Sequence, residues 1–171
     1  MEAEGFVATP QGAWYPPAPC LDEAMGLALE EARAAAGRGE VPVGAVLLWE
    51  GRVLARGHNQ RETYGDPLAH AECVVLREAA RRVGRWRLDR AVLVVTLEPC
   101  PMCMGAMIQA RVPVLVYGAP DPRAGAAGTL YDLSDDPRLN HRIRVVRGVR
   151  QVEAAEVLQE FFRGRRGHPD G

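Results

Sequence analysis

One histidine and one pair of cysteines in this sequence have the residue types and the spacing of a metal site. His70 is followed two residues later by Glu72, and Cys100 and Cys103 form a Cys-x-x-Cys pair that includes Pro101. Structural zinc sites usually have four protein ligands, whereas catalytic zinc sites have three and leave one position for water. His70, Cys100 and Cys103 therefore predict one catalytic Zn²⁺ per chain.

Glu72 supplies the acid–base group that an open zinc site needs. Zinc lowers the pKa of a bound water from about 15.7 to about 7, so hydroxide is available near neutral pH. A neighbouring carboxylate can take a proton from that water and deliver it to the substrate or its leaving group. The chemistry that these residues predict is hydrolysis by a metal-activated water.

Two other interpretations of the same residues stay open at this point. Cys73 follows His70 by three residues and could be a fourth ligand of a structural zinc, although Glu72 would then have no role. The histidine and the cysteines could also occur together by chance, because Cys-x-x-Cys alone is common in redox motifs. The order of the residues, the prolines and Glu72 favour the catalytic site.

The ligand spacing places both halves of the site at helix N-termini. Residues i and i+2 of a helix point about 200° apart, so His70 and Glu72 can serve one metal only from the end of a helix. Apolar spacing predicts that helix over 71–83, and Pro101 is a favoured first residue for a second helix that ends near residue 111. The positive ends of the two helices would help to keep both cysteines as thiolates.

Strands and helices alternate through the rest of the chain. We expect strands at 43–49, 52–57, 91–97, 113–117 and 143–146, and further helices at 22–36 and 152–163. Asp22 is the expected N-cap of the first helix and Gly37 its expected end. The valine-rich strand 91–97 is typical of a strand buried on both faces. The alternation predicts an α/β fold with a mixed sheet covered by helices.

Composition indicates one compact domain with a full core, since the chain has 171 residues, of which 47% are hydrophobic. Residues 1–19 show little periodicity, and we expect a flexible N-terminal extension there, followed by the domain over 20–171. The sequence has no membrane-spanning run and no signal peptide, and its four cysteines indicate a reducing cytoplasm. The net charge of −1 argues against a chain that is basic overall.

Arginine is concentrated in the last quarter of the chain, at positions 138, 142, 144, 147, 150, 163, 165 and 166. On charge alone this is either a solvated basic surface or a patch that contacts phosphates. The pattern leaves both possibilities open.

The His-x-Glu pattern followed by Pro-Cys-x-x-Cys resembles the signature of zinc-dependent nucleobase deaminases. From about residue 22 to 166 the chain resembles bacterial tRNA-specific adenosine deaminases, in the stretches 40–46, 69–72, 96–100, 125–128, 140–142 and 161–163. This resemblance implies a cytidine-deaminase-like fold, three-layer α/β/α with a central five-stranded mixed sheet, and a homodimer. It also implies conversion of adenosine to inosine at the wobble position of a tRNA anticodon, in an arginine tRNA.

The zinc motif alone would equally fit a free-base or nucleoside deaminase of the guanine or cytosine type. The glycine-rich loop at 125–128 and the Phe-Phe-Arg ending are the parts that favour tRNA. Because Glu72 is present, the resemblance implies an active enzyme, whereas a non-catalytic zinc-containing RNA-binding module would not need it.

The resemblance assigns two polar residues to the target nucleotide. Asn59 matches a residue that binds the nucleoside, although it could simply cap a turn beside Gly57-His58. Asp121 matches a position near the sugar-phosphate, where a carboxylate can read a 2′-hydroxyl. The alternative for Asp121, which precedes Pro122, is an ordinary turn.

The other expected contacts are apolar or basic. Val41, with Val43 and Leu97, would line an apolar pocket that holds the base. Phe162 on the last helix would pack near the anticodon loop, and Arg165 and Arg166 would contact phosphate.

Overall fold

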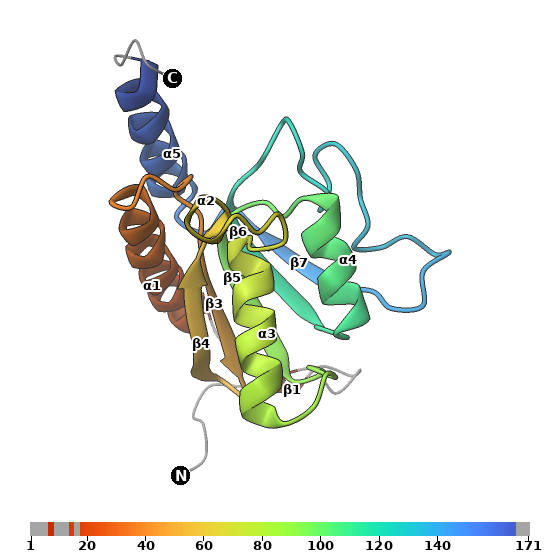
Figure 1. Ribbon diagram of the computed structural model, residues 1–171. Coiled ribbons are helices and arrows are strands. Elements are labelled where there is room, and N and C mark those ends of the chain that lie inside the picture. The colour runs from red at the N-terminus through yellow and green to blue at the C-terminus, as the bar shows by residue number, and fades with distance from the viewer. Residues whose placement is uncertain (1–6, 9–13, 16–17, 167–171) are drawn as a thin grey trace.

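Five strands form one mixed sheet in the computed structural model, which describes residues 7–8, 14–15 and 18–166 (Figure 1). The strand order is β4-β3-β5-β6-β7. β3 (Gly44–Trp49) pairs antiparallel with both β4 (Arg52–His58) and β5 (Ala91–Leu97), whereas β5, β6 (Val114–Ala119) and β7 (Arg144–Arg147) are parallel. The predicted five-stranded mixed sheet is confirmed.

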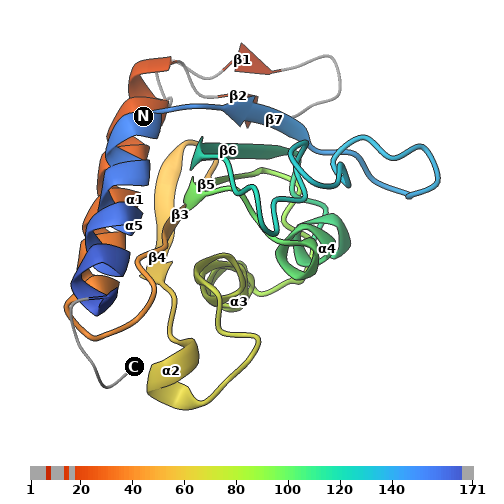
Figure 2. The same ribbon diagram turned by 90° about the horizontal axis from the view of Figure 1, so that it is seen from above.

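Helices cover both faces of this sheet and make three layers, which Figure 2 shows from above. α1 (Ala18–Ala36) and α5 (Gln151–Arg166) lie on one face. α3 (Ala71–Val83) and α4 (Pro101–Gln109) lie on the other, and the short α2 (Arg61–Tyr64) precedes α3. The three-layer α/β/α architecture is confirmed. Within residues 18–166 we find no helix with the length and apolarity needed to cross a bilayer.

Alternate residues of the central strands belong to two separate cores, because successive side chains of a strand point to opposite faces. Leu47 and Leu93 belong to the core under α3 and α4. Val46 and Val94 belong to the core under α1 and α5. The central strand β5 is buried along nearly its whole length, as its valine-rich sequence predicts.

The structure differs from the expectations at the start of the first helix. α1 begins at Ala18 rather than after Asp22, so the assignment of Asp22 as N-cap is wrong. Pro19 does not prevent the earlier start, because proline is tolerated in the first turn of a helix. The helix ends at Ala36, directly before Gly37, as predicted.

The residues expected to form an N-terminal extension are only partly described. β1 (Val7–Ala8) pairs antiparallel with β2 (Trp14–Tyr15). Residues 1–6, 9–13 and 16–17 lie outside the described residues, as do 167–171. The division of the chain into an extension over 1–19 and a domain over 20–171 stays a prediction.

Candidate active site

His70 and Cys100 occupy equivalent positions, each directly before the first turn of a helix. His70 is the N-cap of α3 and Cys100 the N-cap of α4, and both have an extended backbone. The imidazole of His70 makes no capping hydrogen bond to α3, and the hydrogen bond of Cys100 within α4 is to Cys103, another member of the same cluster. Pro101 is the first residue of α4, as predicted. Both side chains are therefore available to a common point between the two helices.

At that point the donor atoms of His70, Cys100 and Cys103 all lie within 4.8 Å of one another. The Nδ1 atom of His70 is 3.5 Å from the Sγ atom of each cysteine. A tetrahedral Zn²⁺, with bonds of about 2.3 Å to sulfur and about 2.0–2.1 Å to nitrogen, separates those two donors by about 3.5 Å. The donor types and their spacing therefore fit a zinc ion with three protein ligands.

Cys73 does not belong to this compact group of donors. Its Sγ lies 3.9 Å from Sγ of Cys103, but the cluster that unites the other three side chains does not include it. This arrangement favours a three-ligand site with an open position over a structural site with Cys73 as the fourth ligand.

The two cysteines of the cluster differ in acidity. Hydrogen bonding with Cys103, supported by His70, lowers the pKa of Cys100 to about 4. The pKa of Cys103 is raised, mainly by its hydrogen bond with Cys100, and that of His70 is raised, again mainly by Cys100. These directions favour the thiolate of Cys100, whereas the thiolate of Cys103 would need a nearby cation to stabilise it.

Glu72 is 4% exposed and lies beside the cluster, with its Oε2 3.5 Å from Sγ of Cys103. Burial raises the pKa of Glu72 to about 7. A divalent cation at the cluster would lower this pKa, because a nearby positive charge favours the carboxylate. The side chain is thus placed to exchange a proton with a water molecule at the open position.

A cavity of about 160 Å³ adjoins the cluster. Its metal side consists of His70, Glu72 and Cys100, and its apolar walls include the predicted Val41, Val43 and Leu97. Asn59 and Asp121 also line it. The volume is well below the roughly 300–1,000 Å³ of sites for drug-sized ligands. It suits one flat base rather than a whole nucleotide.

Asn59 and Asp121 both hold turns as well as facing the cavity. Oδ1 of Asn59 accepts the backbone N–H of Arg61 at 3.2 Å, and its Nδ2 donates to the carbonyl of Val41 at 3.4 Å. Oδ1 of Asp121 accepts the N–H groups of residues 123 and 124, at 2.9 and 3.3 Å. The turn-forming role that the sequence left open is therefore real for both residues, and it coexists with a position at the cavity.

Residues 21–166 match the family model described as MafB19-like deaminase. The chain belongs to this deaminase family. It is 50% identical over 136 residues to the tRNA-specific adenosine deaminase of Bacillus subtilis (strain 168), a match over 80% of this chain and 84% of that one. It is 46% identical over 142 residues to the enzyme of the same name from Agrobacterium fabrum, over 83% of this chain and 93% of that one.

Comparison with solved structures also finds deaminases. One from a study of A-to-I editing by tRNA:A34 deaminases superposes with a TM-score of 0.78 at 46% identity, over 80% of this chain and 99% of that one. The guanine deaminase of Nitrosomonas europaea has a TM-score of 0.70 at 25% identity, over 91% of this chain and 85% of that one. The predicted cytidine-deaminase-like fold and the resemblance to tRNA-specific adenosine deaminases are confirmed, and guanine deaminases are more distant.

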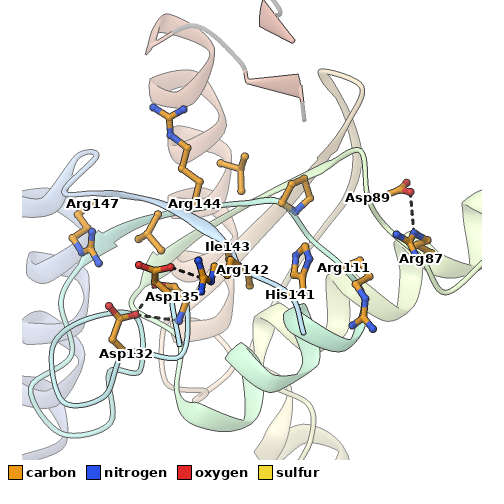
Figure 3. A pocket seen from close by; sticks show the side chains of 14 residues that line it. Arg87, Asp89, Arg111, Asp132, Asp135, His141, Arg142, Ile143, Arg144 and Arg147 are labelled. Atoms are coloured by element: carbon orange, nitrogen blue, oxygen red, sulfur yellow. Dashed lines mark hydrogen bonds and ion pairs between the residues drawn. The ribbon is translucent and has the colours of Figure 1, made fainter. Parts of the chain in front are cut away.

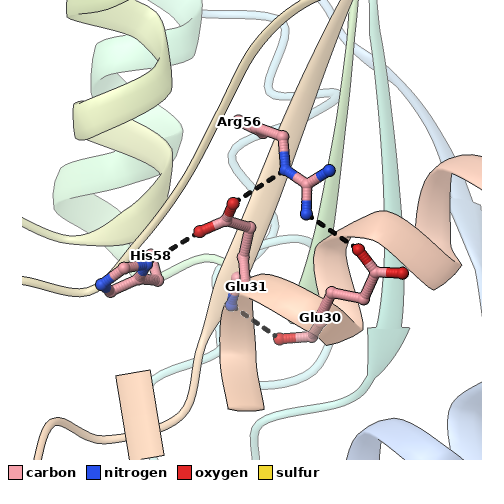
Figure 4. A network of polar contacts seen from close by, with 6 residues as sticks. Glu30, Glu31, Arg56 and His58 are labelled. Atoms are coloured by element: carbon pink, nitrogen blue, oxygen red, sulfur yellow. Dashed lines mark hydrogen bonds and ion pairs between the residues drawn. The ribbon is translucent and has the colours of Figure 1, made fainter. Parts of the chain in front are cut away.

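The end of β4 leads into the deaminase cavity, and a polar network attaches it to α1 (Figure 4). Glu31 of α1 accepts a hydrogen bond from Arg56 at 2.8 Å and pairs with Nδ1 of His58, also at 2.8 Å. Arg56 also donates to Glu30 at 3.0 Å. Because His58 directly precedes Asn59, the network fixes the point from which Asn59 enters the cavity.

Three predicted RNA contacts lie outside the cavity, on α5. Phe162 is 40% exposed. Arg165 stacks on the ring of Phe161, 4.5 Å from its centroid, and donates to the carbonyl of Gly39 at 2.8 Å. Arg166 is exposed. The structure thus anchors the end of α5 to the turn after α1, and the RNA contacts of Phe162, Arg165 and Arg166 stay predictions.

The sequence did not indicate two features that shape the cavity. Arg61 lines it from α2, a helix of four residues that is too short to show periodicity. The buried carboxylate of Glu40 holds this helix by accepting hydrogen bonds from the backbone of Glu62 and Thr63. Glu98 also lines the cavity, and the only signals for it were its place between the strand and Cys100 and its position within the resemblance stretch 96–100.

A larger cavity of about 1,050 Å³ lies along β7 and shares no residue with the metal cluster (Figure 3). Several of its arginines already have partners: Arg87 pairs with Asp89 at 3.1 Å, and Arg142 pairs with Asp135 at 3.3 Å. The chemistry of the side chains, rather than volume, identifies the smaller cavity as the candidate active site.

Proposed function

We propose that this chain catalyses the hydrolytic deamination of adenosine to inosine at the wobble position of a tRNA anticodon, with an arginine tRNA as the substrate. One observation carries the chemistry: a His-Cys-Cys donor set with zinc spacing lies at a base-sized cavity, beside a buried glutamate. The names of the relatives at 46–50% identity support tRNA as the substrate.

The residues divide the reaction between them. A zinc ion bound by His70, Cys100 and Cys103 would supply the Lewis acid that makes water a nucleophile at neutral pH. Glu72 takes one proton of that water and delivers it to a ring nitrogen of adenine. It then takes the second proton, from the hydroxyl added to C6, and delivers it to the amino group, which leaves as ammonia. The burial of Glu72 keeps these transfers away from bulk solvent.

The apolar walls receive the base. An adenosine in an anticodon loop is already unpaired, so moving it into a pocket costs less than flipping it from a duplex. Val41, Val43 and Leu97 contact its faces, and Asn59 binds its polar edge. Asp121 reads the 2′-hydroxyl, because one of its oxygens, Oδ2, receives no hydrogen bond within the described residues.

Beyond the cavity, Phe162, Arg165 and Arg166 would contact the anticodon stem-loop. We also propose a cytoplasmic homodimer. Trp86 is 62% exposed, and it borders a hollow at the end of α4 together with Ala106 and Ala110. Contiguous exposed apolar side chains, rather than single ones, mark interaction surfaces, and this hollow groups Trp86 with two alanines. Light scattering on Trp86→Arg tests this, since the substitution should shift the mass of the particle from two chains to one.

The test of function uses a short anticodon stem-loop of arginine tRNA with adenosine at the wobble position. Wild-type protein and Glu72→Ala are incubated with it, and the digested RNA is scored for inosine. Zinc content is measured for both proteins. Inosine with the wild type alone supports the substrate, the reaction and the role of Glu72 together.

Free guanine, cytosine and cytidine are tested in parallel. If zinc-loaded wild type converts one of these and leaves the stem-loop unchanged, the enzyme is a small-molecule deaminase and the tRNA proposal fails. RNA binding without turnover of any substrate would instead indicate a non-catalytic RNA-binding module.

A further inference from the structure

Glu98 is a buried carboxylate that the proposed reaction does not use. It is 2% exposed and lies between Leu97, which lines the cavity, and the turn that carries Cys100. Hydrogen-bond donors from the loop 121–129 surround it. Its Oε1 accepts the backbone N–H of Asp121 at 3.2 Å and the hydroxyl of Thr129. Its Oε2 accepts the backbone N–H groups of Ala127 at 3.1 Å and Thr129 at 3.2 Å.

The loop closes tightly around this carboxylate. The N–H of Gly125 donates to the carbonyl of Asp121 at 2.9 Å, and the N–H of Ala126 donates to the carbonyl of Pro99 at 2.8 Å. A Cβ atom on Gly125 would lie 2.4 Å from Oε2 of Glu98. The loop is therefore attached to the metal-bearing turn through one side chain and one backbone contact.

A buried carboxylate is a costly way to hold a loop, because its charge loses hydration. Hydrogen bonds to an ionised acceptor are roughly twice as strong as neutral ones, and four of them satisfy Glu98. A buried, hydrogen-bonded carboxylate adds little to the net free energy of folding, and its main effect is to hold its partners in one defined geometry. What Glu98 defines is the position of the loop that carries Asp121.

The contacts of Asp121 show why this position matters. Its backbone N–H is bound by Glu98, and Oδ1 of its own side chain accepts two N–H groups from residues 123 and 124. Both ends of Asp121 are thereby fixed relative to the turn that leads to Cys100. Only when Asp121 is held at this distance from the turn can Oδ2, its other carboxylate oxygen, reach a hydroxyl of the sugar.

We propose that Glu98 is a positioning residue that sets the distance between Asp121 and the metal cluster, and so determines how strongly the enzyme prefers ribose to deoxyribose at the target nucleotide. This inference rests on the proposed function. It adds a residue at the wall of the cavity that takes part in neither metal binding nor proton transfer but controls selection of the sugar.

The test compares two stem-loops that differ only in carrying adenosine or 2′-deoxyadenosine at the wobble position. Glu98→Gln replaces one acceptor oxygen by an N–H₂ group that faces N–H donors, so the loop must move. A displacement of about 1 Å can cost about 100-fold in kcat/KM. We expect a loss of that order for adenosine, a much smaller loss for deoxyadenosine, and unchanged zinc content.

Glu40→Gln is the matched control. Glu40 is also buried and accepts three hydrogen bonds, against four at Glu98, but it holds α2 on the other side of the cavity. It should lower thermal stability as Glu98→Gln does, and it should leave the ratio of ribose to deoxyribose turnover within about twofold of wild type. A purely structural role of Glu98 would make the two variants alike.

A double-mutant cycle shows whether Glu98 acts through Asp121. In the background of Asp121→Ala, Glu98→Gln should not change the sugar ratio further. Thr129→Val removes one of the four hydrogen bonds and gives a milder change in the same direction, which keeps the test valid if Glu98→Gln does not fold.

The outcomes separate the two proposals. If wild type converts the adenosine stem-loop and the sugar ratio is unchanged in both Glu98→Gln and Thr129→Val, the inference about Glu98 fails and the proposed function stands. The inference about Glu98 also fails if Glu40→Gln lowers the ratio of ribose to deoxyribose turnover as much as Glu98→Gln does. If zinc-loaded wild type converts neither stem-loop, the proposed function fails, and the claim about sugar selection fails with it.

Discussion

Adding one methyl group at Gly125 should damage the substrate loop while leaving the metal site intact. A Cβ there would lie 2.4 Å from Oε2 of Glu98 and 2.5 Å from the carbonyl oxygen of Asp121. Gly125 is not among the glycines with a positive φ, so Gly125→Ala acts through contact alone. Neither neighbour can rotate away, because the first accepts hydrogen bonds from the loop and the second accepts one from Gly125 itself.

Ordinary contact begins at 3.4 Å, so the loop must shift by about 1 Å. Overpacking of this kind costs about 1–3 kcal/mol of folding free energy. For a chain of this size, that lowers Tm by roughly 2–12 °C. A shift of about 1 Å at Asp121, which we propose contacts the sugar, should lower kcat/KM on the stem-loop by about 100-fold. Zinc content should stay at one per chain, because His70, Cys100 and Cys103 lie outside the loop.

Gly37→Ala is the control, since the same methyl group is added at an exposed position where the nearest atom is 3.5 Å away. Its effect on stability should be within about 0.5 kcal/mol and its activity unchanged. The measurements are calorimetric Tm, bound zinc and the rate of inosine formation. Wild-type turnover by Gly125→Ala would refute the view that the loop is held rigidly around Glu98.

Three further predictions concern the metal, the proton and the RNA. Glu72→Gln should retain zinc and lose turnover by about 10²–10⁴-fold, the range for general acid–base groups. A loss of less than about 10²-fold would assign the proton transfers to another residue. Metal analysis should find one zinc per chain in Cys73→Ala and almost none in Cys103→Ser, whereas loss of zinc from Cys73→Ala would make Cys73 a ligand. Deleting residues 163–171 should weaken RNA binding and reduce its salt dependence by about 0.7 per lost phosphate contact, and an unchanged slope would mean that the arginines of α5 form only a solvated surface.

The parts of the fold that the sequence predicted are those with a periodic or positional signal. The strand 91–97 and the helix 71–83 have the predicted limits, because an unbroken apolar run and an apolar stripe mark them. The grouping of the His70, Cys100 and Cys103 donors also follows from residue type and spacing, which zinc chemistry restricts severely. Pro101 indicated the start of α4 for a purely local reason, its fixed φ.

The parts that the sequence did not predict depend on contacts between distant residues. α2 has no periodic signal, and Glu40, more than 20 positions earlier in the chain, holds it in place. Asp22 looks like an N-cap, but α1 begins upstream of it. The role of Glu98 is visible only once the loop 121–129 is seen to fold around it. Non-local hydrogen bonds leave no periodic trace in a sequence.

The polar groups of the cavity are fixed before any substrate arrives. Oδ1 of Asn59 and Oδ1 of Asp121 each hold a turn, and each residue keeps a second polar atom, Nδ2 or Oδ2, with one long hydrogen bond or none in the described part of the chain. Binding therefore does not have to order these side chains, and the entropy cost of holding the base is small. If Asn59 and Asp121 bind substrate as we propose, the same design limits the substrate, because a rigid amide and a rigid carboxylate fit one arrangement of base and sugar. Turn-forming bonds and the proposed substrate contacts are then not alternatives at these two residues, since the first would make the second selective.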